Sequence, residues 1–137
     1  MKKYFIILGC IQAFIALGAI PAGIGYLNDP TGTGLGTSVE ILKDSPFSDF
    51  LIPALFLLIV NGLGNVFGTV LSLRKKPIAG KAGFVLGVIL CFWILIQVYW
   101  IGLISFMQPM FLIIGIIEGS LGLIIIKKHK NGKFRIT

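Results

Sequence analysis

Residues 109–130 read PMFLIIGIIEGSLGLIIIKKHK, an apolar stretch with a single acid, Glu118, near its middle. The stretch supplies the roughly 20 residues that an α-helix needs to cross the hydrocarbon core of a membrane. Because a charged side chain at the bilayer centre costs about 2.5–3.5 kcal/mol, such a residue normally faces the protein interior and has a partner or a proton. The stretch therefore predicts a membrane helix whose acid is surrounded by other helices.

Composition extends this prediction to the whole chain. Of the 137 residues, 56% are hydrophobic and 12% are charged, and the mean hydropathy is +0.99. A water-soluble domain could not bury so much apolar surface. Four apolar runs have membrane-spanning length, at residues 4–26, 50–73, 82–104 and 109–126. The sequence predicts an all-α integral membrane protein, a single membrane domain over residues 1–137 that forms an antiparallel bundle of four transmembrane helices.

The distribution of charge predicts the topology. The net charge is +7, and all but one of the 12 lysines and arginines lie in three segments, at residues 2–3, 74–81 and 127–137. The loop between the first two runs, residues 27–49, instead carries Lys43 and four acids. Because basic segments stay in the cytoplasm, both termini are expected inside a bacterial plasma membrane and the loop outside it.

The same basic segments do not indicate a partner other than lipid. Topology and attraction to anionic lipid headgroups explain them fully. No basic face interleaved with aromatic residues exists outside these short segments. The lipid bilayer is therefore an expected partner, and nucleic acid is not.

The outer loop carries structural signals of its own. Residues 28–36 are rich in turn-forming residues. Thr37, followed three residues later by Glu40, fits a capping box that opens a short amphipathic turn over residues 39–42. We expect an amphipathic elbow on the outer membrane surface, placed where it could cover the bundle.

Small and polar residues follow one face of each of the first two spans. On the second span they stand at positions i, i+4, i+7 and i+11, and they are Asn61, Asn65, Gly68 and Ser72. On the first span the corresponding residues are Gly9, Gln12, Ala16, Ala19 and Gly23. Small residues let membrane helices approach closely, and amides in lipid must face protein. Both faces are therefore predicted to lie in the interior.

Four polar or polarisable side chains are predicted to lie at the same depth in the membrane. At about 1.5 Å of rise per residue, Gln12, Asn65, Cys91 and Glu118 each lie roughly 12–14 Å from the inner end of their spans. We predict that Glu118 is hydrogen-bonded to Asn65 or Gln12 and carries a proton, since desolvation disfavours the charged form. The candidate binding residues are Glu118, Asn65, Asn61, Gln12 and, nearer the outside, Gln97.

The other reactive residues give little support for an enzyme. Cys10 and Cys91 lie in the inner halves of their spans, and the chain has no Cys-x-x-Cys pair, so inert buried thiols are the better interpretation. The single histidine, His129, lies in the basic tail. The spacing predicts neither a metal site nor a catalytic residue, and it identifies no cofactor.

Three functions are compatible with the polar layer. In the first, the layer around Glu118 binds a partner protein or the polar end of a lipophilic small molecule. In the second, Glu118 carries the proton of a small proton-coupled permease or exporter. In the third, the protein has no site, and the polar residues only hold the helices together, each bond contributing about 0.5–2 kcal/mol.

The layout also resembles a known family. The loop Asp29-Pro30-Thr31-Gly32-Thr33-Gly34 follows a first span, and a glycine-rich second span ends in basic residues before a closing pair of spans. This arrangement is similar to the DoxX-like group of small bacterial membrane proteins. Members tend to carry an acid in the second span, where this chain has Asn61 and Gly62. The resemblance implies an accessory subunit of a membrane redox complex linked to quinones.

Overall fold

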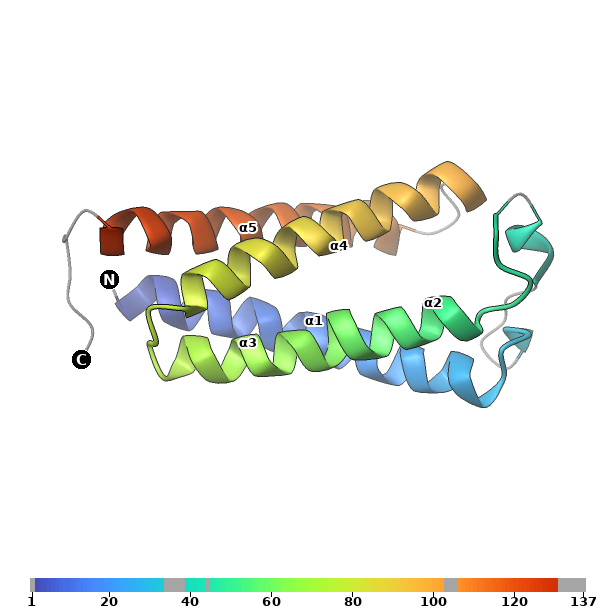
Figure 1. Ribbon diagram of the computed structural model, residues 1–137, viewed down its shortest axis with the longest axis horizontal. Helices are drawn as coiled ribbons and strands as arrows, with labels where there is room; N and C mark the ends of the chain where they lie inside the picture. The colour runs from blue at the N-terminus through green and yellow to red at the C-terminus, as the bar shows by residue number, and fades with distance from the viewer. Residues whose placement is uncertain (1, 34–38, 44, 103–105, 131–137) are drawn as a thin grey trace.

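The computed structural model describes residues 2–33, 39–43, 45–102 and 106–130, and the regular structure in these ranges is helical (Figure 1). Four helices are long and apolar enough to cross a membrane: Lys2–Asn28, Leu51–Leu73, Ala79–Trp100 and Met107–Lys128. The predicted number and order of apolar helices is therefore confirmed.

The second of these helices is not uniform. It consists of α2 (Leu51–Phe56), the π-helical segment η3 (Leu57–Leu63) and α3 (Gly64–Leu73). The other long helices are α1 (Lys2–Asn28), α4 (Ala79–Ile101) and α5 (Met107–Lys130). A short 3-10 helix, η2 (Val39–Leu42), lies between α1 and α2.

Several helix boundaries differ from the sequence prediction. The third span begins at Ala79 and the fourth at Met107, where the sequence suggested residues 82 and 109. Pro109 fits inside the first turn of α5 because its missing N–H would have no helical partner there. α4 ends at Ile101, and the next residue, Gly102, has φ 78° and ψ 178°, an extended positive-φ conformation open to glycine because it lacks a Cβ atom.

Two predicted features lie outside the described residues. One is Thr37 of the proposed capping box, although Glu40 lies in the 3-10 helix η2. The other is the end of the predicted third span, residues 103–104.

Polar contacts mark the start of the second span. The side chain of Asp49 accepts a hydrogen bond from the backbone N–H of Leu51 at 3.0 Å, which closes a local turn just before α2. The N–H of Phe50 donates to the carbonyl oxygen of Pro30 at 2.9 Å. This bond brings the two ends of the outer loop together above α1 and α2.

Two helix pairs make up the bundle. α1 packs along α2, η3 and α3, and α4 packs along α5; the pairs meet where α1 contacts α5 and where α3 contacts α4. Within the described residues α3 and α5 make no contact, so they lie at opposite corners of the bundle. The start of α1 and the end of α5 lie at one end of the molecule, and η2 lies at the other (Figure 1).

Glycines bring α4 and α5 into backbone contact. A Cβ atom added at Gly87 would lie 2.7 Å from the carbonyl oxygen of Gly115 and 2.7 Å from the Cα of Gly119. One added at Gly122 would lie 2.5 Å from the carbonyl oxygen of Gly80. Such close approach through small residues is typical of membrane helix pairs.

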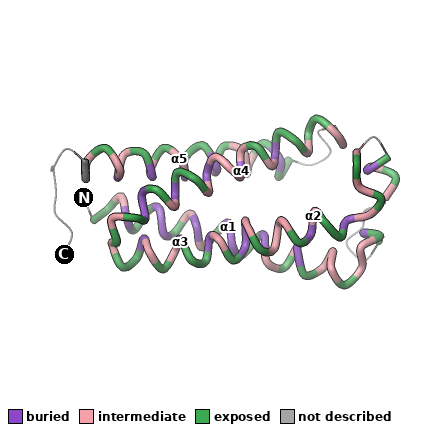
Figure 2. Tube along the Cα trace, viewed as in Figure 1, coloured by how far each residue is buried: buried purple, intermediate pink, exposed green. Residues whose placement is uncertain are grey.

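Burial follows the faces that the sequence predicted (Figure 2). Every small or polar residue predicted on the inner faces of the first two spans is buried. The outside of the bundle carries large apolar side chains, such as Leu17, which is 74% exposed, and Phe92, which is 61% exposed. An exterior of this kind is suited to contact with lipid.

Candidate functional site

The predicted acid lies in the interior of the bundle. Glu118 has a relative exposure of 0%, and neither of its carboxyl oxygens has a hydrogen-bond partner. Gln12, Asn61, Asn65 and Ser72 are also 0% exposed. The side chain of Glu118 therefore points away from the lipid-facing surface and into a set of buried polar groups.

Two neighbouring helices supply the surroundings of Glu118. The side chain of Gln12 on α1 interacts with the carboxyl group, although no hydrogen bond of standard geometry joins them. The thiol of Cys91 on α4 lies within electrostatic range. The Oε1 atom of Gln12 instead accepts a hydrogen bond from the hydroxyl of Ser72 at 2.8 Å.

The predicted hydrogen bond between Glu118 and Asn65 is wrong. Asn65 lies on α3, which does not contact α5 in the described part of the chain. Its Nδ2 atom donates to the backbone carbonyl oxygen of Asn61, one turn away, at 2.8 Å. The alternative partner, Gln12, does interact with the carboxyl group, although its Nε2 atom forms no hydrogen bond of standard geometry.

Two clusters of apolar side chains stand on either side of Glu118 and Gln12 along the bundle. We call one the inner seal; it consists of Phe5, Leu8, Ala79 and Ile125. We call the other the outer seal; it consists of Ile15, Leu90 and Ile94. Each of these residues is 6% exposed or less. The polar groups around Glu118 are thus enclosed by apolar layers.

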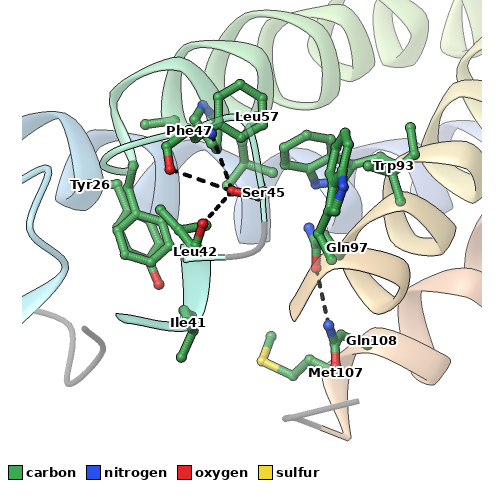
Figure 3. Close-up of a pocket in the computed structure, with 15 residues that line it drawn as sticks. Tyr26, Ile41, Leu42, Ser45, Phe47, Leu57, Trp93, Gln97, Met107 and Gln108 are labelled. Atoms are coloured by element: carbon green, nitrogen blue, oxygen red, sulfur yellow. Dashed lines mark hydrogen bonds between the residues drawn. The ribbon is translucent and has the colours of Figure 1, made fainter. Parts of the chain in front are cut away.

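An outer cavity of about 320 Å³ opens at the end of the bundle that carries η2 (Figure 3). α2 and η3 form one wall and α4 forms the opposite wall. The roof consists of Ile41, Leu42, Ser45 and Phe47. The Ser45 hydroxyl orders this roof, because it donates to the carbonyl oxygen of Leu42 at 2.8 Å and accepts from the N–H of Phe47 at 3.2 Å. Phe47 in turn makes an edge contact with Trp100 on α4, at 6.1 Å between ring centroids.

A smaller chamber of about 170 Å³ continues this cavity inward. The two spaces have five lining residues in common, Leu57, Trp93, Gln97, Met107 and Gln108. The three residues of the outer seal line the chamber as well. Asn61 lies in its wall, and neither the Nδ2 nor the Oδ1 atom of Asn61 has a hydrogen-bond partner.

The predicted binding residues thus fall into two groups. Glu118, Gln12 and Asn65 line neither cavity, whereas Asn61 and Gln97 line the chamber. The Oε1 atom of Gln97 accepts a hydrogen bond from the Nε2 atom of Gln108 at 3.5 Å (Figure 3).

The predicted binding residues leave out most of the cavity walls, including Trp93, Trp100 and Gln108. A signal was present, because Trp93, Gln97 and Trp100 stand at i, i+4 and i+7 and share one face of α4.

No protein family model, curated protein or solved structure matches the chain. The resemblance to the DoxX-like group therefore stays a prediction. No group of three histidine, cysteine or acidic side chains that could hold a metal ion occurs among the described residues. The chemistry open to the site is that of amides, aromatic rings and one buried acid.

Proposed function

We propose that the protein binds an uncharged lipophilic small molecule in the chamber and the outer cavity. The observation that carries this proposal is Asn61, whose amide is 0% exposed, lies in the chamber wall and has no side-chain hydrogen bond. Buried polar groups are rarely left without partners. A ligand group that both donates and accepts, such as a hydroxyl or a primary amide, would satisfy this amide.

The cavity walls indicate that the rest of the ligand, beyond the polar group that binds Asn61, is apolar. Tyr26, Phe47, Phe50, Trp93 and Trp100 line the outer cavity. Among the described residues, the cavity and the chamber are lined by no aspartate, glutamate, lysine, arginine or histidine. The outer cavity, at about 320 Å³, falls within the range of roughly 300–1,000 Å³ that is typical of small-molecule sites.

The proposed setting is a bacterial plasma membrane. In it the four helices cross the bilayer as an antiparallel bundle with both termini in the cytoplasm, as the basic segments favour. The outer loop then forms an amphipathic elbow at the outer surface, with Ile41, Leu42, Ser45 and Phe47 above the cavity. A lipophilic ligand would enter from the outer half of the membrane, beneath this elbow.

Intrinsic fluorescence tests the proposal, because the only two tryptophans of the chain, Trp93 and Trp100, both line the cavity. The probe is an eight-carbon alcohol with a bromine at its far end, added to the full chain in lipid vesicles. We expect saturable quenching of tryptophan fluorescence. The bromoalkane of the same length, which lacks the hydroxyl, should quench weakly and without saturation.

A matched pair of variants tests whether the quencher binds inside the cavity. Ala54 is 1% exposed and lines the cavity, so Ala54→Leu should fill part of the space and reduce quenching several-fold. Ala13 is partly buried on α1 and lines neither cavity, so Ala13→Leu should leave quenching unchanged. Unsaturable quenching that is equal in both variants would contradict the proposal, and it is the result expected if the polar residues only hold the helices together.

A further inference from the structure

Glu118 is a buried acid that ligand binding in the chamber does not use. We propose that Glu118 is a proton-binding site that exchanges its proton with the chamber across the outer seal, and that this exchange is linked to ligand occupancy. The dependence of proton exchange on ligand occupancy rests on the proposed ligand site. The assignment of Glu118 as a proton-binding site does not depend on it. Together they would make the protein a carrier or sensor in which a proton and a lipophilic molecule influence each other.

The surroundings of Glu118 favour a neutral carboxyl group. An isolated carboxylate in an apolar interior is so costly that the group takes up a proton instead. From α1 it faces the uncharged amide of Gln12, and from α4 it faces Cys91, the one titratable neighbour in the described residues. The backbone of α3 makes no contact with that of α5 in the described residues. The lysines and arginines lie at the ends of the spans or in the outer loop, so no cation is available to pair with it.

The outer seal is the one that borders a cavity. Its residues Ile15, Leu90 and Ile94 all line the chamber, so the chamber reaches the apolar layer next to the polar groups. None of the four residues of the inner seal lines the chamber or the outer cavity. Both seals are packed against further apolar side chains, so access to a cavity, and not thickness, distinguishes them.

Two amide side chains of the second span, Asn61 and Asn65, could bind water on its way between the chamber and Glu118. Asn61 lies in the chamber wall, and Asn65 lies one turn further in, joined to it by the hydrogen bond from Nδ2 to the Asn61 carbonyl oxygen. The Oδ1 atom of Asn65 has no partner and is buried. Water that passes the outer seal would find these groups to bind, since buried water occupies sites with several polar partners.

Infrared spectroscopy of the full chain in lipid vesicles tests the proton site. We expect the carbonyl band of a protonated carboxylic acid at neutral pH in the unmodified protein. The band should persist in Glu40→Gln, which changes an exposed acid of the outer segment, and should be absent in Glu118→Gln. A carboxylate band assigned to Glu118 at neutral pH would overturn the proposal.

The rate of deuterium exchange, read from the shift of that band in heavy water, tests the route. Ile15→Ala opens the outer seal and should speed exchange about tenfold, since exchange follows local opening. Leu8→Ala makes a comparable cavity in the inner seal and should change the rate little. Retention of the Glu118 band shows that each variant is folded. The reverse ranking would overturn the outer route.

The brominated alcohol tests the link. We expect it to slow exchange at Glu118 at concentrations that quench tryptophan fluorescence. If it quenches but leaves exchange unchanged, the link is wrong. If it fails to quench while the Glu118 band is present, the ligand site is wrong and the proton site stands.

Discussion

Gln12 is the side chain that connects the two helix pairs at the level of the buried acid. Its Oε1 atom accepts from Ser72 on α3, and its amide interacts with Glu118 on α5. Its carboxamide also lies directly over Gly68, where an added Cβ atom would be 2.6 Å from Nε2. One amide therefore contacts polar groups on two helices that do not touch each other in the described residues.

Replacing Gln12 should weaken the bundle. In Gln12→Leu the hydroxyl of Ser72 loses its acceptor and Glu118 loses its amide neighbour. We expect the free energy of unfolding to fall by about 1–3 kcal/mol, the usual cost of leaving a buried polar group unsatisfied. Denaturant unfolding in detergent micelles, followed by helical circular dichroism, measures this change.

Gln97→Leu is the matched control for this variant. Gln97 is only partly buried, and its bond to Gln108 is long, at 3.5 Å. Its replacement should therefore cost less than half as much stability. If both variants lower the free energy of unfolding equally, Gln12 contributes no more to stability than a partly buried amide.

The sequence predicted which of these residues are buried but not which of them meet. Helical periodicity shows the side of a helix that faces inward, and all the predicted inward residues of the first two spans are buried. It does not show the order of helices around the bundle. Asn65 and Glu118 were expected to bond because both face inward, yet they lie on helices at opposite corners.

At the scale of elements, the sequence did not predict the π-helical segment η3. It spans Leu57–Leu63 and includes Asn61, the amide of the chamber wall. π-helical turns are rare and occur frequently at functional sites. Nothing in the apolar pattern of this segment distinguishes it from an α-helix, because the choice depends on tertiary contacts such as that between Gly62 and Ile20.

The pairing of α4 with α5 leads to a prediction about two facing glycines. In Gly87→Ala the new methyl group would overlap the backbone of α5, whereas in Gly119→Ala its nearest neighbours would be 3.9 Å away. We expect Gly87→Ala to lower the free energy of unfolding by about 1–3 kcal/mol, as overpacking does. Gly119→Ala should be neutral or slightly stabilising, because alanine favours helix.

The same unfolding measurement compares the two glycine variants. Equal effects would show that α4 and α5 do not approach as closely as these contacts indicate. A larger loss in Gly119→Ala would place the closest contact on the other side of the helix pair.

At the scale of the whole molecule, the outer cavity lies where the two helix pairs separate. Within the described residues the backbone of α2 packs along α1, and α2 meets α4 through the stacked rings of Phe56 and Trp93, whose centroids are 4.7 Å apart. Composition was enough to predict four apolar helices, because hydropathy and length determine which segments can span a membrane. The cavity could not be predicted in this way, because an empty space is what remains after every side chain has packed.

The central claim is that this space binds a lipophilic molecule, and photolabelling tests it most directly. A long-chain alcohol that carries a photoreactive diazirine would be irradiated with the full chain in lipid vesicles, and its adducts located by mass spectrometry. We predict adducts on Leu57, Trp93 and Gln97, which line both spaces, and loss of these adducts with excess unlabelled alcohol or in Ala54→Leu. Adducts confined to outward-facing residues such as Phe92 and Ile116, with no competition, would contradict the claim.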